Sequence, residues 1–163
     1  MATRFVLLPG SAEYPAANFP QLMLVNRRPV LAFDATTGET AYWTVIAPQG
    51  ITGTWTGVIS YIMASATTGG VALDIAAEAV TSGDAVDLDA ATSFDTVNGG
   101  SDAAVPGTVG YMEQISITLT NMDGVAAGDY LRFSLARDVA DAADTATGDC
   151  YVLVSKSAIC ACI

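Results

Sequence analysis

The stretch VGYMEQISITLTN, residues 109–121, decides the fold class. Its apolar side chains stand at alternate positions with polar side chains between them: Tyr111, Ile115, Ile117 and Leu119. Successive side chains of a β-strand point to opposite faces, so this alternation predicts a strand with one buried and one solvated face. The sequence NMDG, residues 121–124, follows with the composition of a turn.

Similar stretches lie on both sides of this strand. VALDIAAEAV, residues 71–80, alternates as regularly and follows the turn sequence TTGG. The chain as a whole predicts about eight strands, at 29–34, 40–48, 54–66, 71–80, around Phe94, 109–121, 129–138 and 150–159. With no predicted helix, and a long polar stretch over 81–108, this series predicts an all-β jelly-roll or Greek-key β-sandwich.

Residues 1–29 differ from the rest of the chain. Four prolines in this segment argue against a regular helix or a central strand. The segment is therefore predicted to be an extended N-terminal arm, with room for one short edge strand at residues 21–25, and residues 30–163 to be the sandwich domain. The apolar side chains of the arm need a surface to pack on, either the chain's own body or a neighbouring subunit. The predicted interface residues of the arm are Phe19, Leu22, Met23, Leu24, Arg27 and Arg28.

Composition excludes several classes of protein. Hydrophobic residues make up 52% and charged residues 14%, which argues against disorder. The net charge of −11, with six basic and seventeen acidic residues, disfavours nucleic acid and anionic membranes as partners. No apolar run reaches the roughly 18 residues of a membrane-spanning helix. The first residues lack the long apolar core of a signal peptide, so we expect a protein made and kept in a cytoplasm.

Cysteine and histidine usage limits the metal chemistry. The chain has three cysteines, at positions 150, 160 and 162, and no histidine. An odd count clustered at one end is not a disulfide framework. Cysteine-only zinc sites need four thiolates, so a zinc ion would have to be shared between subunits. Buried, reduced thiols are the favoured interpretation.

Acidic loops are the remaining candidates for a cation site. In DVADAADTATGDC, residues 138–150, the acids are spaced by three and no glutamate follows, which does not fit an EF-hand loop. Solvated loops are favoured, and no metal or cofactor is predicted. The weak alternatives as calcium or magnesium ligands are Asp87, Asp89, Asp138 and Asp141.

Catalysis is not predicted either. Without histidine the chain cannot form a Ser-His-Asp or Cys-His arrangement, and it has no phosphate-binding loop. Aromatic side chains could stack on sugars, although core packing is favoured for all of them: Tyr42, Trp43, Trp55, Tyr61 and Tyr111. Tyr42 and Trp43 are neighbours and must face opposite ways, so one of them is predicted to be exposed or at an interface.

An ordered series of short motifs connects the chain to a family. FDATT (33–37), GDAVD (83–87), PGTVGY (106–111), AAGDYLR (126–132) and DTATGD (144–149) together resemble small β-sandwich virion structural proteins of tailed bacteriophages. The resemblance covers roughly residues 30–155. It implies a non-enzymatic head decoration, or cement, protein assembled in the host bacterial cytoplasm. Such a protein is usually a homotrimer, seated on the outer capsid surface against the major capsid protein.

Two parts of the chain agree with this expectation. The apolar arm could clasp a neighbour, and the apolar C-terminal end has the composition of a segment buried between subunits, with Cys160, Cys162 and Ile163 as its interface residues. Two alternatives stay open. One is a carbohydrate-binding or adhesion module of a phage tail fibre or baseplate, acting through Tyr42 or Trp43. The other is a calcium-stabilised binding domain.

Overall fold

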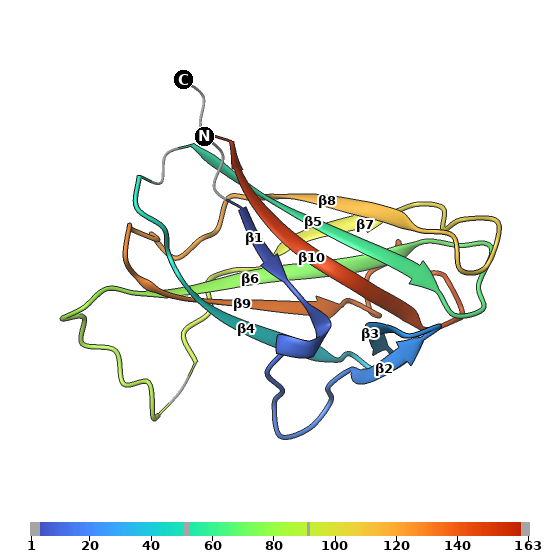
Figure 1. Cartoon of the computed structure of the whole chain (residues 1–163), viewed down its shortest axis with the longest axis horizontal. Coiled ribbons are helices and arrows are strands. Elements are labelled where there is room, and N and C mark those ends of the chain that lie inside the picture. The colour runs from blue at the N-terminus through green and yellow to red at the C-terminus, as the bar shows by residue number, and fades with distance from the viewer. Residues whose placement is uncertain (1–3, 51–52, 91, 161–163) are drawn as a thin grey trace.

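A computed structural model describes residues 4–50, 53–90 and 92–160, and in these residues the chain forms two packed antiparallel sheets (Figure 1). The larger sheet has six strands: β1 (Arg4–Leu7), β2 (Gln21–Val25), β3 (Arg28–Phe33), β5 (Thr54–Met63), β8 (Glu113–Leu119) and β10 (Cys150–Cys160). The smaller sheet has four: β4 (Thr40–Ile46), β6 (Val71–Val80), β7 (Asn98–Asp102) and β9 (Tyr130–Arg137). The 3-10 turn η1 (Pro9–Ser11) follows β1. No described helix is long and apolar enough to cross a membrane.

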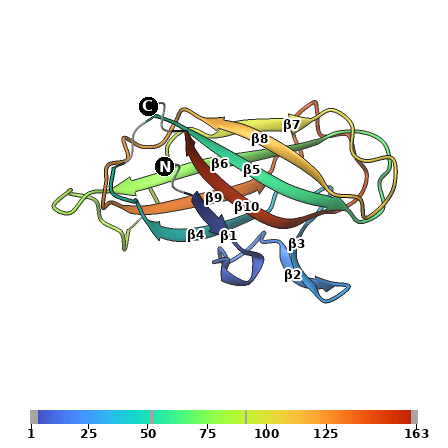
Figure 2. The ribbon, with the colours of Figure 1, turned by 45° about the horizontal axis from the view of Figure 1, so that its top comes forward.

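The strand order is that of a jelly roll. β6 pairs with β7, β5 with β8, β4 with β9 and β3 with β10, so the chain is a long antiparallel hairpin wrapped into two layers. The resulting orders are β2-β3-β10-β5-β8 and β4-β9-β6-β7 (Figures 1 and 2). This confirms the predicted all-β sandwich, and of the two predicted arrangements, jelly roll and Greek key, the strand pairing is that of the jelly roll.

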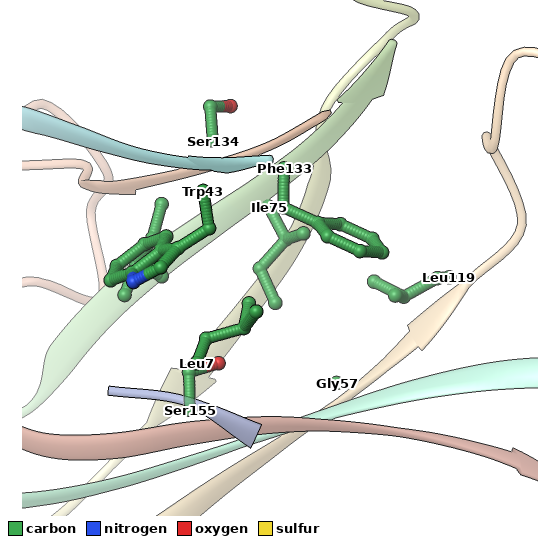
Figure 3. Close-up of a pocket in the computed structure, with 9 residues that line it drawn as sticks. Leu7, Trp43, Gly57, Ile75, Leu119, Phe133, Ser134 and Ser155 are labelled. Atoms are coloured by element: carbon green, nitrogen blue, oxygen red, sulfur yellow. The ribbon is translucent and has the colours of Figure 1, made fainter. Parts of the chain in front are cut away.

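The core lies between the sheets and is filled by the inward side of each strand. On β5, Trp55, Ile59, Tyr61 and Met63 share one parity and all point into the core. Figure 3 shows where the layers meet: Leu7 of β1 lies opposite Trp43 and Ile75 of the smaller sheet, around a void of only about 10 Å³. A void of this size is no ligand site.

The N-terminal segment differs from the predicted arm, because it belongs to the larger sheet. β1 pairs with β10, with Leu7 opposite Ser155, and β2 pairs with β3 along its whole length. The four prolines do not prevent this pairing. Pro9 begins the turn η1, Pro15 and Pro20 lie in the connection before β2, and Pro29 is the second residue of β3. The edge strand expected at residues 21–25 is β2.

Two strand predictions need correction. The strand expected around Phe94 lies at Asn98–Asp102, and Phe94 instead stacks on Tyr42 with ring centroids 5.5 Å apart. Tyr111 was assigned to the inner face of the strand at 109–121, but β8 begins at Glu113 and Tyr111 is 66% exposed. In the case of Tyr111, an apolar residue of a loop extended the alternation beyond the real strand.

Candidate binding surface

The β2–β3 hairpin forms one margin of the larger sheet and projects from the body of the molecule (Figure 2). Val25 pairs with Arg28 across a two-residue loop, in which Asn26 and Arg27 have φ values of 46° and 67°. Two consecutive positive φ values identify a type I′ turn, whose twist matches that of the flanking strands. The turn therefore holds β2 in place as an ordered edge strand.

This hairpin presents apolar side chains to solvent. Leu22, Met23 and Leu24 are 52, 38 and 72% exposed, although all three lie within a strand. Phe19, in the segment before β2, is also exposed and packs against Tyr14 with ring centroids 5.4 Å apart. Arg27 and Arg28 are exposed as well. The structure thus gathers the residues predicted for the arm on one hairpin and its approach, and their role as an interface stays a prediction.

The predicted C-terminal interface lies mostly beyond the described chain. Cys160 ends β10, where it pairs with Thr54 of β5. Cys162 and Ile163 lie outside the described residues. Burial of this end between subunits therefore stays a prediction.

Two hollows lie beside the hairpin, and both are lined by Arg28 and Leu153. The first, of about 500 Å³, extends to Ile62 and Met112. The second, of about 580 Å³, extends to Leu8. Met112 and Leu8 are more than half exposed. Contiguous exposed apolar surface of this kind marks interaction sites on soluble proteins.

Charge is distributed unevenly along this margin. Arg27 and Arg28 stand at the turn end of β2. At its other end, a hollow of about 120 Å³ is lined by Asp34, Glu39 and Asp149 together with Gln21 and Met23. The hairpin therefore has a basic end and an acidic end.

The acids at the second end have different environments. Hydrogen bonds from the hydroxyl and backbone of Thr36, and from the backbone of Thr37, lower the pKa of Asp34 to about 2. Burial raises the pKa of Glu39, whose carboxylate accepts a hydrogen bond from the backbone of Asp34 at 2.9 Å. Asp34 therefore stays ionised down to low pH, and Glu39 gains its proton more easily.

Three of the four weak cation candidates cap local turns. Asp87 accepts a hydrogen bond from the backbone of Asp89 at 3.0 Å, Asp138 from Ala140 at 3.0 Å, and Asp141 from Ala143 at 2.7 Å. Within the described residues, no group of three or more acids or cysteines could hold a metal ion. These carboxylates explain the shape of the loops without a ligand.

Sequence analysis missed the ion pair that organises the loop at 138–150. Arg137 is buried, and its guanidinium donates to Asp144 from Nε at 2.9 Å and from Nη2 at 2.8 Å. It also donates to the carbonyls of Ala146 and Gly148. In the predicted strand at 129–138, which alternates through Leu131, Phe133 and Leu135, Arg137 was expected to face outward or across the sheet, and the structure corrects this. Arg137 is two residues after the inward-facing Leu135, so the alternation of the strand indicates a buried side chain. That signal was set aside because arginine is usually exposed.

The aromatic candidates for sugar stacking are largely occupied. Trp43 and Trp55 are 3 and 4% exposed, and Trp43 donates its indole hydrogen bond to the carbonyl of Leu8 at 3.0 Å. Tyr42 faces outward, as one of the pair had to, but it stacks on Phe94 and lies under the guanidinium of Arg132. The exposed aromatic rings are those of Tyr14, Phe19 and Tyr111 among the described residues.

Comparisons with known proteins identify no family for this chain. No family model matches, and no curated protein matches its sequence. Among solved structures, a CBM35 from Cellvibrio japonicus Abf62 is 10% identical, with 95% of this chain and 92% of that chain covered and a TM-score of 0.49. A non-crystalline cellulose specific carbohydrate-binding module, CBM28, is 8% identical, with 90% and 84% covered and a TM-score of 0.45. At these scores neither similarity carries an argument, and the β-sandwich assignment rests on the chain's own strand pairing.

Proposed function

We propose that this chain is a non-enzymatic binding module that docks onto another protein through the two adjoining hollows beside the β2–β3 hairpin. The observation that carries the proposal is a pair of adjoining hollows that share the half-buried Leu153, with the exposed side chains of Leu8 and Met112 on either side of it. Protein interfaces combine an apolar centre with arginine and a polar rim, and Arg28 lies between the two hollows.

The finer form of the proposal is a virion structural protein. The motif series in the sequence resembles phage virion proteins, and a decoration protein needs an adhesive face and no reactive centre. In this form the partner is the major capsid protein and the location is the outer surface of the head. The homotrimer that the resemblance implies stays a prediction.

Quantitative mass spectrometry of purified particles of the phage that encodes this chain tests the finer form. A decoration protein is expected at a copy number equal to that of the major capsid protein, or at a fixed fraction of it. A few copies per particle would overturn the decoration role and favour a tail component. Absence from the particle would overturn any role in the virion.

A carbohydrate-binding or adhesion module is the second candidate, and one observation favours it. Tyr111 is 66% exposed, and Tyr14 and Phe19 form an exposed pair of rings, so aromatic faces are available to stack on a sugar. Binding on a glycan array that is lost in Tyr111→Ala or Phe19→Ala, while Tyr42→Ala keeps it, is the expected result. Absence of binding at high protein concentration would exclude this candidate.

A further inference from the structure

The outer edge of β2 is open and unusually apolar for an edge strand. Among the described residues, no strand pairs with it beyond β3. Natural proteins usually protect a sheet edge with a charged residue, a proline or a bulge. The five residues of β2, Gln21–Val25, contain no charge and no proline, and they pair with β3 without a shift of register.

The register shows which backbone groups face this edge. A type I′ turn closes with a hydrogen bond between its first and fourth residues, so Val25 and Arg28 form a hydrogen-bonded pair. Such pairs alternate along an antiparallel ladder, so Leu24 and Pro29 form a non-hydrogen-bonded pair. Pro29 has no N–H to donate, which fits this position. The N–H and C=O groups of Leu22 and Leu24 therefore point away from β3 to the open edge.

We propose that β2 pairs with β2 of a second copy of this chain, antiparallel and across a twofold axis at Met23. The strand reads almost the same in both directions about Met23, with leucine on either side. In this register Leu22 of one copy lies opposite Leu24 of the other, and their outward groups form four hydrogen bonds. Met23 meets its own copy in the non-hydrogen-bonded pair at the centre. The larger sheets of the two copies then form one continuous sheet.

Charge complementarity favours a second copy of this chain as the partner that pairs with the open edge of β2. Antiparallel pairing places the acidic end of one hairpin, with Asp34, Glu39 and Asp149, beside the basic end of the other, with Arg27 and Arg28. Because of the twofold axis, this contact between an acidic and a basic end occurs twice in the dimer. Arg28 lies level with Val25, two residues from the axis, and Arg27 lies in the turn beyond it. The arginines of the two copies therefore stand at opposite ends of the shared ladder, about four residues or roughly 13 Å apart along the strand, which is beyond the Debye length at physiological salt.

This contact goes beyond the docking function and does not depend on what the hollows bind. A twofold contact produces dimers and cannot close a trimer. The mass of the particle in solution therefore distinguishes it from the threefold assembly implied by the resemblance.

The first experiment removes one outward donor. Sedimentation equilibrium of the wild-type chain is expected to give twice the monomer mass of 16.7 kDa. Leu24→Pro removes the N–H that points to the open edge and leaves the β2–β3 ladder intact, so we expect dimerisation to weaken at least tenfold. Leu24→Thr loses the same leucine but keeps the N–H, and should weaken it less. A wild-type monomer, a trimer, or a Leu24→Pro dimer of unchanged affinity would overturn the proposal.

The second experiment locates the axis in a protein that folds. Residues of a central non-hydrogen-bonded pair have Cα atoms about 4.5 Å apart, within the range of a disulfide. Met23→Cys is therefore expected to give a dimer crosslinked through position 23, identified by mass spectrometry of the non-reduced peptides. Leu24→Cys is the matched control, because diagonal positions lie about 7–8 Å apart and should not crosslink. Equal crosslinking of both variants, or none in either, would overturn the twofold register.

Discussion

The guanidinium of Arg137 and the carboxylate of Asp144 form a forked ion pair whose side chains are 0 and 3% exposed. Asp144 also accepts a hydrogen bond from the backbone of Ala72 at 3.0 Å, so one carboxylate links β9, β6 and the loop that leads to β10. Asp144 therefore anchors the acidic stretch at 138–150 to the body, together with backbone hydrogen bonds from Thr145 and Ala146 to Gly70, while Asp138 and Asp141 cap local turns.

We expect Asp144→Asn to destabilise the fold by about 3–5 kcal/mol, because it leaves the buried Arg137 without its counter-charge. Asp141→Asn is the matched control, since Asp141 is exposed and its amide analogue can still accept from Ala143. That control should change stability by less than about 0.5 kcal/mol. Urea unfolding measures both, and equal losses would contradict the assigned role of the pair.

Gly57 lies where the two sheets approach each other (Figure 3). A Cβ atom there would clash with Cδ1 of Ile75. Gly57→Ala should therefore cost about 1–3 kcal/mol through overpacking. Ile75→Val removes that Cδ1 atom and should recover part of the loss in the double variant. Gly10→Ala, which meets nothing within 4 Å, is the control for thermal unfolding. An undisturbed melting temperature in Gly57→Ala would argue against this close approach.

Burial raises the pKa of the Cys150 thiol to about 12 from an ordinary value of 9.0. The native state therefore keeps a proton that the unfolded state loses, and stability should fall as the pH rises above about 9. The thiol should also be inert in the folded protein. In a Cys160→Ser, Cys162→Ser background, a thiol reagent at pH 8 is expected to react with Cys150 only after urea unfolding. Rapid reaction without urea would show that the site is open.

Asp34 predicts the opposite dependence on pH. Its folded pKa of about 2 lies below the ordinary 3.8, so its contribution to stability is full above about pH 4 and is lost as the pH falls towards 2. Asp34→Asn keeps an acceptor for Thr36 and cannot titrate. Its stability should therefore fall less than that of the wild-type chain between pH 4 and 2, in chemical denaturation at each pH. Parallel curves would contradict this assignment.

Much of the fold could be predicted from the sequence, because alternation over 71–80 and 113–119 reports directly on a half-buried sheet. Loop side chains could not be placed by the same rule. Phe94 is an aromatic residue in a polar stretch, and it covers the outer face of the smaller sheet instead of forming a strand. Tyr111 continues the alternation of β8, yet it faces solvent. Arg137 was misplaced for the converse reason, since its burial depends on Asp144, whose position is set by a loop.

The candidate surface could be predicted only in part. Leu22, Met23 and Leu24 stood out as apolar residues among prolines, which is a local signal. Their exposure depends on the type I′ turn at Asn26 and Arg27, which the sequence interpretation did not identify. The hollows could not be predicted, because they bring together Leu8, Arg28, Met112 and Leu153 from distant parts of the chain.

For the proposed role as a virion protein, the most direct test of docking is the binding of the purified chain to the capsid shells that it is proposed to decorate. Met112 lines a hollow and is 58% exposed, whereas Val97 lies before β7 in the smaller sheet and is 53% exposed, so the two are matched in exposure. In cosedimentation, the wild-type chain and Val97→Asp should bind saturably with similar affinity, and Met112→Asp at least tenfold more weakly. A wild-type chain that fails to bind, or a Met112→Asp variant that binds as well as the wild type, would contradict the account.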